Sequence, residues 1–308
     1  MKAVFARLPS AVDTRIRVFA IATLVAQILI VGTGGAVRLT GSGLGCPTWP
    51  RCTAESFVTT PEMGIHGIIE FGNRLLTFVL VLIAIIMFVL VLRIRRERRD
   101  LFVLALVIGL YVPIQAIIGG ITVLTNLNPY VVGLHYLASV VLVSLSAVLV
   151  FRVFVGPRGE RIPLPVWFFA LVHATAVLTA MTILVGILVT GSGPHAGDGG
   201  AARNGLDSEL LQHVHSWPAY ATFAATVLLV IGAWRLRQAR MLRFAVILLV
   251  VELVQIAVGL TQARLGLPEL LVGIHMVLAC CLAAAMTAVV LSLREPRHAE
   301  AYGAASAG

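Results

Sequence analysis

Eight long apolar runs constrain this chain more than any other feature of its sequence. They cover about residues 17–37, 68–92, 101–124, 131–155, 166–190, 210–234, 242–262 and 271–293. A bilayer core needs roughly 20 apolar residues per helical span, whereas the strands of a membrane barrel are about 10 residues long and alternate in polarity. Since 59% of the residues are hydrophobic and only 12% charged, the sequence predicts an all-α integral membrane protein with eight transmembrane helices.

The basic residues lie in alternate loops and therefore indicate the orientation of the chain. Of the 23 Lys and Arg residues, 18 lie in or beside the N-terminal segment, the loops near 93–99, 156–165 and 235–243, and the C-terminal segment. Loops rich in Lys and Arg stay in the cytoplasm. We therefore expect a multi-pass protein of the cytoplasmic (cell) membrane with both termini inside, and we attribute the net charge of +9 to topology, not to nucleic-acid binding.

The chain repeats itself. The third and fourth spans match the seventh and eighth at a constant offset of 140 residues, pairing Gln115 with Gln255, Gly119 with Gly259, Gly133 with Gly273, and His135 with His275. Because each repeat has an even number of spans, both halves insert with the same orientation. We predict two tandem four-helix bundles, residues 1–155 and 156–294, related by pseudo-two-fold symmetry along the membrane normal. Residues 295–308 are expected to form a disordered cytoplasmic tail.

The first loop outside the cytoplasm contains "TGSGLGCPTWPRC" (40–52). Disulfides persist in that compartment, so Cys46 and Cys52 are interpreted either as a bridge closing a seven-residue loop or as two unpaired thiols. Cys280 and Cys281 lie inside the last span and are expected to be reduced core residues.

Histidines mark the candidate site, because an ionisable side chain inside a membrane span is costly and by default functional. His135, His215 and His275 lie about one turn into even-numbered spans, and His66 lies just ahead of the second span. Imidazoles from facing helices, without nearby thiolates or carboxylates in the sequence, suit axial ligation of haem iron better than tetrahedral zinc. We predict that His215 and His275 hold one haem. The alternative is a set of histidines that hydrogen-bond across helices.

The second span begins with "HGIIEFGNRLL" (66–76), which places His66, Glu70 and Asn73 on one helical face with Arg74 beside them. Two interpretations of Glu70 are open: a catalytic carboxylate near a pocket in the outer leaflet, or a structural ion pair with Arg74.

Other polar residues are expected to have supporting roles. Glu252, Gln255 and the equivalent Gln115 are expected to serve polar packing between helices. His173 is expected to be a buried hydrogen-bonding residue. His195 and Asp198, in "GSGPHAGD", are interpreted either as plain loop residues or as contacts to a haem propionate or a partner.

In combination, "GSGLGCPTWPRC", "IIEFGNR", "GLHYL", "LQHVHS" and "GIHMV" resemble the haem A synthase family over nearly the whole chain. The resemblance implies a membrane oxidoreductase that converts a methyl group of haem O to the formyl group of haem A for cytochrome oxidase. It implies haem b as cofactor and haem O as substrate. Haem O synthase and cytochrome oxidase assembly are then candidate partners; a homo-oligomer is a further candidate, although the sequence does not determine the oligomeric state.

The resemblance also suggests roles for single residues. His215 and His275 match the ligands of a haem b that passes electrons, His135 matches a ligand of the substrate haem iron, and Glu70 matches a catalytic acidic residue. Cys46 and Cys52 match a cysteine pair of the family's first loop.

The sequence departs from the family at Asn73, where the family has its second-helix histidine ligand. Substrate haem is then held by His135 alone, with Asn73 and Arg74 in support, or His66 moves in from roughly 10 Å farther along the helix axis.

Two other functions compete with haem modification. The first is a di-haem b-type membrane electron carrier, which would leave haem O unchanged. The second is a transporter or structural membrane protein, which would bind no chromophore.

Overall fold

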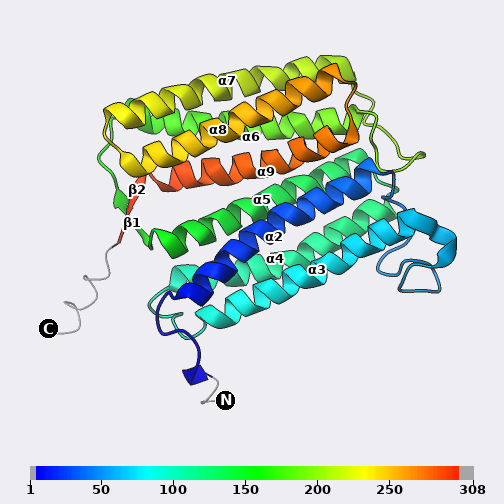
Figure 1. Cartoon of the computed structure of the whole chain (residues 1–308), viewed down its shortest axis with the longest axis horizontal. Helices are drawn as coiled ribbons and strands as arrows, with labels where there is room; N and C mark the ends of the chain where they lie inside the picture. The colour runs from blue at the N-terminus through cyan, green and yellow to red at the C-terminus, as the bar shows by residue number, and fades with distance from the viewer. Residues whose placement is uncertain (1–4, 298–308) are drawn as a thin grey trace.

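The computed structural model describes residues 5–297, and its main elements are eight long helices in two groups of four (Figure 1). The first group consists of α2 (Thr14–Leu39), α3 (Gly64–Val91), α4 (Arg99–Leu124) and α5 (Pro129–Phe154). The second consists of α6 (Val166–Ser192), α7 (Ser208–Arg235), α8 (Ala239–Arg264) and α9 (Glu269–Leu291). All eight are long and apolar enough to cross a membrane. The predicted all-α membrane fold with eight spans is confirmed.

The two groups share a common core. Helices α2 and α5 pack against α9 of the other group, and α5 also contacts α6. Val31, Val143, Ile183 and Cys280 are buried together in one apolar cluster drawn from these four helices. The Tyr136 hydroxyl on α5 donates a hydrogen bond to the carbonyl oxygen of Met276 on α9, at 3.0 Å. Positions 136 and 276 are equivalent at the 140-residue offset of the repeat.

Polar side chains cap several helices where hydropathy alone places no sharp boundary. Asp13 accepts a hydrogen bond from the Ile16 N–H at 3.1 Å and begins α2. Slight burial raises the pKa of Asp13, but the Ile16 N–H and the Arg15 guanidinium outweigh this effect and hold it below its usual value. Asn128 caps α5, and Asp207 caps α7. These caps start the helices ahead of the apolar runs.

The longer helices change the predicted depth of two histidines. A short 3₁₀ turn (Pro61–Met63) leads directly into α3 at Gly64, so His66 lies in the first turn of the helix and not ahead of it. Because α7 begins at Ser208, His215 lies about two turns into its helix instead of one.

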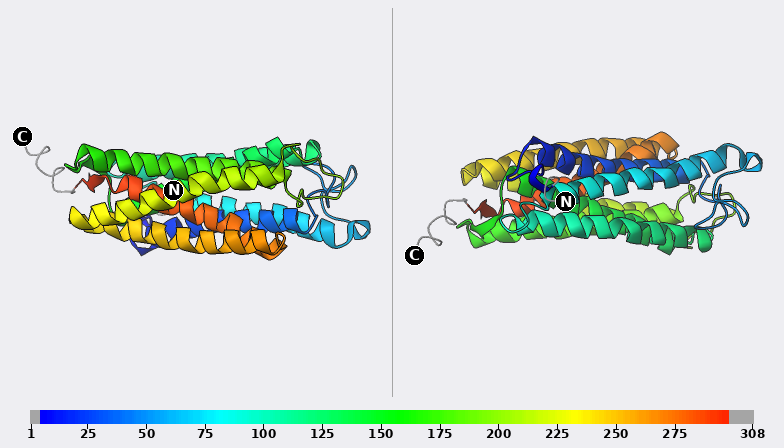
Figure 2. Two further views of the ribbon diagram at one scale, coloured as in Figure 1. Left: turned by 90° about the horizontal axis from the view of Figure 1, so that it is seen from above. Right: turned by 90° about the horizontal axis from the view of Figure 1, so that it is seen from below.

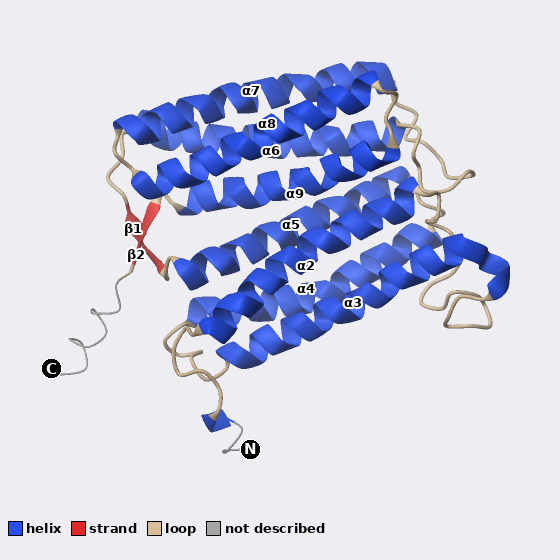
Figure 3. Cartoon of the chain, in the orientation of Figure 1, coloured by secondary structure: helices blue, strands red, loops and turns tan. Residues whose placement is uncertain are grey.

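Two short strands, β1 (Arg158–Arg161) and β2 (Arg294–Pro296), pair antiparallel at one end of the molecule (Figure 3). Residues 295–297 therefore do not belong to a disordered tail as predicted: Glu295 and Pro296 lie in β2, and the Arg297 N–H donates to the carbonyl oxygen of Pro157 at 3.1 Å. The rest of the predicted tail, from residue 298, lies outside the described residues.

The helices run side by side along the long axis, and their longest loops gather at one end (Figure 2). We call this the disulfide end. It carries residues 40–63, 125–128, 193–207 and 265–268. The opposite end, which carries β1, β2 and the loop between α3 and α4, is called the basic end.

Candidate functional site

His215 of α7 and His275 of α9 face each other inside the second group of helices. Their ring centroids are 6.3 Å apart, and the ring planes are inclined by 73°. Two metal–imidazole bonds of about 2 Å on opposite sides of one ion, plus about 1 Å from each bonded nitrogen to its ring centre, give about 6 Å. The Nδ1 atom of each ring is buried and has no hydrogen-bond partner among the described residues. The donor set and its spacing fit an iron-centred group held from two sides.

A glycine from the neighbouring helix makes room for each of these rings. A Cβ atom on Gly186 of α6 would lie 3.0 Å from Cε1 of His215, and one on Gly259 of α8 would lie 3.0 Å from Cε1 of His275. The Gln255 side chain also donates a hydrogen bond to the carbonyl oxygen of His275 at 3.2 Å. Each ring is therefore seated in a notch that admits no larger residue without displacement.

The first group of helices repeats this arrangement around His135. A Cβ atom on Gly119 of α4 would lie 3.1 Å from Cε1 of His135. Gln115 donates to the carbonyl oxygen of His135 at 3.0 Å and to the Ser139 hydroxyl at 2.5 Å. The His135 Nδ1 is again buried without a partner in the described part of the chain. The expected polar packing of Gln115 and Gln255 between helices is confirmed. In both halves the glutamine donates a hydrogen bond to the backbone carbonyl oxygen of the candidate histidine ligand.

The residue that replaces the expected second ligand of this half is used for helix packing. The Asn73 side-chain oxygen accepts a hydrogen bond from the Thr33 hydroxyl of α2 at 2.8 Å. His66 lies two turns away, where its Nδ1 is 2.9 Å from the Ser42 hydroxyl. It lines a cavity of about 590 Å³ at the disulfide end together with Pro47, Met63 and Asp198, among others. The structure thus places His66 against the loop, and no hydrogen bond joins its ring to His135.

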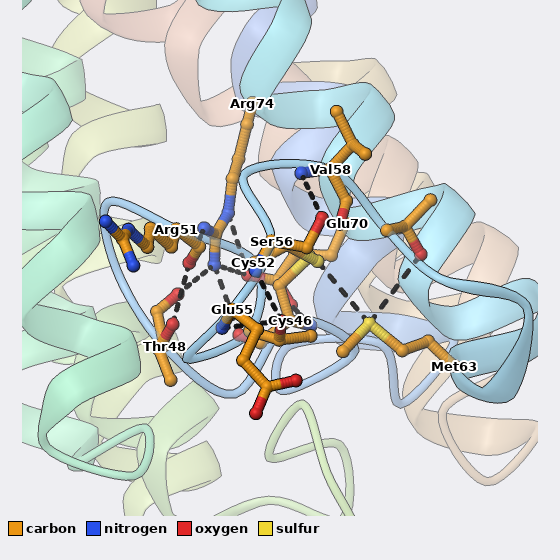
Figure 4. Close-up of a disulfide and its surroundings, with 12 residues drawn as sticks. Cys46, Thr48, Arg51, Cys52, Glu55, Ser56, Val58, Met63, Glu70 and Arg74 are labelled. Atoms are coloured by element: carbon orange, nitrogen blue, oxygen red, sulfur yellow. Dashed lines mark hydrogen bonds and ion pairs between the residues drawn. A yellow bond between two sulfur atoms is a disulfide. The ribbon is translucent and has the colours of Figure 1, made fainter.

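Glu70 and Arg74 attach the first loop of the disulfide end to α3 (Figure 4). One carboxylate oxygen of Glu70 accepts from the Cys46 N–H at 2.5 Å, and the other accepts from the Arg74 guanidinium at 2.5 Å. Arg74 also donates to the carbonyl oxygens of Cys46, Thr48 and Arg51, at 3.1, 2.9 and 3.2 Å. The Cys46–Cys52 bridge is present, which confirms the disulfide, and the structural ion pair considered for Glu70 is formed.

The same loop reaches the first-half site through Trp49. A Cβ atom on Gly120 of α4 would collide with the Trp49 indole, while one on the adjacent Gly119 would press on the His135 ring. Two neighbouring glycines therefore admit two rings, one from the loop and one from α5. No sequence motif predicts this contact, and its one signal in the sequence is the pair "GG" at 119–120.

Loops from both halves interlock at the disulfide end. Arg38, at the end of α2, donates to the carbonyl oxygens of His195 and Thr190, at 2.7 and 2.8 Å. The His195 ring donates through Nε2 to the carbonyl oxygen of Leu267 at 2.9 Å. His195 therefore has the loop role considered for it. Asp198 accepts from the N–H of the nearby Gly200 and lines the cavity next to His66.

The structure also places Cys280, Cys281 and His173, which were given minor roles. Cys280 and Cys281 are free thiols, buried and half-buried, as expected. His173 was expected to be buried, but its side chain lies on an exposed face of α6. It bonds back to the carbonyl oxygen of Phe169, at 2.8 Å, and its ring lies 4.4 Å from the Phe169 ring. A hydrogen bond within its own helix satisfies this histidine without burial.

A family model described as cytochrome oxidase assembly protein (COX15-CtaA) matches residues 17–287, a range that contains every candidate site residue. The chain belongs to this family. Proteins named heme A synthase from Listeria monocytogenes serovar 1/2a and Exiguobacterium sibiricum are each 25% identical, over 178 and 181 residues. These alignments cover 56% and 58% of this chain and 58% and 60% of the relatives. A heme A synthase from Bacillus pumilus is 32% identical over 145 residues, which are 46% of this chain and 45% of the relative.

The alignments with these relatives thus span about three fifths of their length or less. Together with the family match, they confirm the resemblance to the haem A synthase family that the loop and histidine motifs indicate.

Proposed function

We propose that this protein is a haem A synthase, a membrane oxidoreductase that oxidises a methyl group of haem O to the formyl group of haem A for cytochrome oxidase. The observation that carries the proposal is the His215–His275 pair, whose ring centroids are 6.3 Å apart. In the other half, His135 is seated against a glycine in the same way as His275. One half has two facing imidazoles and the other has one. This asymmetry suits one site for electron transfer and one for chemistry.

In this proposal, His215 and His275 hold haem b in the second half of the chain. Held by these two imidazoles, haem b would supply one-electron transfer rather than a place for a substrate to react. The protein's own contribution is to fix the two rings. Gly186 and Gly259 admit them, and Gln255 holds the backbone of His275.

The first half would take haem O. His135 binds the iron from one side, and Asn73, already bonded to Thr33, leaves the other side without a second imidazole. His66 is the remaining candidate ligand and would have to leave its Ser42 contact to reach the iron. A site with one strong ligand can admit a reactant at the open position.

Glu70 supplies the carboxylate of this site, as one half of an ion pair with Arg74. Glu70 is 5% exposed, and its carboxylate is fixed by the Cys46 N–H and by Arg74. A fixed negative group stabilises positive charge that develops on the substrate methyl carbon during oxidation, and it can accept the proton that leaves. The disulfide, Arg74 and Trp49 would hold the loop over the substrate.

The test is haem analysis of purified protein after co-expression with a haem O source. Glu70→Gln keeps the shape of the side chain and removes its charge, so haem A should fall at least about tenfold while haem b remains bound. Glu62→Gln is the matched control, because Glu62 is exposed in the turn before α3.

Two results would contradict the proposal. Unchanged haem A in Glu70→Gln would remove the catalytic role of Glu70. A wild-type protein that carries haem but leaves haem O unmodified would be the di-haem electron carrier instead.

A further inference from the structure

Glu252 is a buried carboxyl group that the proposed reaction does not use. It lies halfway along α8 and is 4% exposed. One oxygen accepts a hydrogen bond from the Thr226 hydroxyl of α7 at 2.8 Å, and the other is buried with no partner in the described part of the chain. Its role in helix packing, expected from the sequence, accounts for only the first of these oxygens. Burying the second without a partner is costly.

Buried hydroxyl groups lead from Glu252 toward the His215–His275 pair. Thr226 lies one helical turn from Thr222, and the Thr222 hydroxyl is 3.3 Å from that of Thr182 on α6. Thr182 in turn lies one turn from Gly186, the glycine that seats the His215 ring. These three threonines are 0%, 3% and 9% exposed. Buried hydroxyl groups thus lie at intervals between the carboxyl group and Gly186, and those of Thr222 and Thr182 also donate to carbonyl oxygens of their own helices.

Glu252 has no acidic counterpart in the first half of the chain. At the repeat offset of 140 residues, Glu252 corresponds to Val112, which is buried in an apolar cluster with Leu80, Ile108 and Leu142. Yet Gln255 and Gly259, on the same helix as Glu252, do have polar and glycine counterparts. The carboxyl group therefore accompanies the paired rings and not the fold common to both halves.

We propose that Glu252 is the proton site of the electron-transfer centre: it takes up one proton when one electron arrives between His215 and His275, and releases it when the electron leaves. The proposal rests on the proposed function, since it needs haem b at this pair. The electron comes from an external one-electron donor and converts ferric to ferrous iron. The proton comes from water and forms an O–H bond on Glu252.

The physical reason is charge balance in an apolar interior. From Glu252 to Gly259, beside the His275 ring, is seven residues, or about 10 Å along the helix. Opposite charges at this distance attract strongly where little water screens them. An ionised Glu252 balances the positive oxidised centre. Once the centre has gained an electron, that attraction is lost and a proton on Glu252 restores neutrality.

None of the other titratable groups on α8, or on the helices packed against it, forms a hydrogen bond or an ion pair with Glu252 in the described part of the chain. They are Glu209, His213, His215, Tyr220 and Arg235 on α7, Arg240, Arg243 and Arg264 on α8 itself, and Glu269, His275, Cys280 and Cys281 on α9. Among the described residues, Thr226 makes the single side-chain hydrogen bond to Glu252, and no ion pair reaches it.

The experiment measures the midpoint potential of the bound haem b at a series of pH values. In the wild type, the potential should rise as the pH falls, with a slope approaching one proton per electron over part of the range. Glu252→Gln should make the potential nearly independent of pH over that range. Glu209→Gln, which changes an exposed carboxylate at the start of α7, should keep the wild-type slope.

A second measurement covers the case in which Glu252→Gln does not fold. The infrared difference spectrum of reduced minus oxidised wild type should contain a positive carboxylic-acid band, and Thr226→Val should move that band to higher frequency by removing its hydrogen bond. A wild-type potential without pH dependence, a slope that persists in Glu252→Gln, or a carboxyl band that Thr226→Val leaves unmoved would overturn the proposal. Protein that binds no haem at His215 and His275 would overturn the proposed function instead.

Discussion

Three glycines belong to the candidate site together with its histidines, because each makes room for one histidine ring. Gly119, Gly186 and Gly259 each lie on a helix next to the one that carries the ring. In an exposed helix, a glycine costs about 1 kcal/mol relative to alanine. At these positions the missing Cβ atom is what lets an imidazole lie against the neighbouring backbone. Replacing one of these glycines with alanine should therefore stabilise the helix but disturb the histidine ring that the glycine admits.

Gly259→Ala tests this at the paired site. The added Cβ atom would lie 3.0 Å from Cε1 of His275, and overpacking of this kind costs about 1–3 kcal/mol. Haem b affinity, measured by titration of the purified protein, should fall roughly tenfold or more. Gly109→Ala is the control, because its Cβ atom would meet only the Ala84 Cβ at 4.0 Å. Equal haem affinity in the two variants would refute the role of the notch.

Residue types and repeat spacing predict part of the site. The histidines are recognisable because they are ionisable groups inside apolar runs, and His135 and His275 recur at one offset. The hydrogen-bonding partner of a polar residue cannot be recognised in this way, because it depends on how neighbouring helices are rotated about their axes. The bond from Thr33 to Asn73, and the one from Thr226 to Glu252, join residues 40 and 26 positions apart. No local pattern contains that information.

At the scale of elements, the loop between α2 and α3 is fixed by more than its disulfide. Arg74 of α3 donates to Glu70 and to three loop carbonyl oxygens. The planar guanidinium can serve several acceptors in fixed directions, whereas the ammonium group of lysine cannot match that geometry. The helix and the loop therefore form one unit over the first-half site.

Arg74→Lys should loosen this unit while leaving the disulfide intact. Losing charge-assisted hydrogen bonds at a partly buried site costs about 2 kcal/mol, so the protection of the Cys46 amide against hydrogen exchange should fall roughly tenfold or more. Arg51→Lys is the control, because the Arg51 side chain bonds only to the carbonyl oxygen of Ala54 in the described structure. Unchanged exchange at Cys46 in Arg74→Lys would mean that the bridge alone fixes the loop.

Hydropathy predicts the eight helices because their length and composition follow from the membrane. It predicts their ends less well. Asp207 starts α7 several residues before the apolar run, and the 3₁₀ turn at Pro61–Met63 carries His66 into α3. The β1–β2 pair is not predictable from side-chain pattern, because backbone hydrogen bonds hold two very short segments together.

At the scale of the whole molecule, the two halves share a plan and differ at their centres. Both have a glutamine that bonds to the backbone of a histidine and a glycine that seats its ring. The second half adds a second facing ring and Glu252, whose place in the first half is taken by the apolar Val112. Interlocked loops and a common core join the halves. In the proposed function, electrons would therefore pass from one site to the other through the packed protein interior. That function also requires both sites to lie toward the same membrane face, the one at the disulfide end.

The distribution of basic residues predicts that this face is outside the cytoplasm, and single cysteines can test it. Ala202→Cys lies in the disulfide-end loop before α7, and Ala239→Cys lies at the basic end of α8; both positions are exposed. The native cysteines give little background, because Cys46 and Cys52 are bridged and the other two lie within α9. A membrane-impermeant maleimide should label Ala202→Cys in intact cells and Ala239→Cys only after permeabilisation. The reverse pattern would place the disulfide in the reducing cytoplasm and invert the predicted topology.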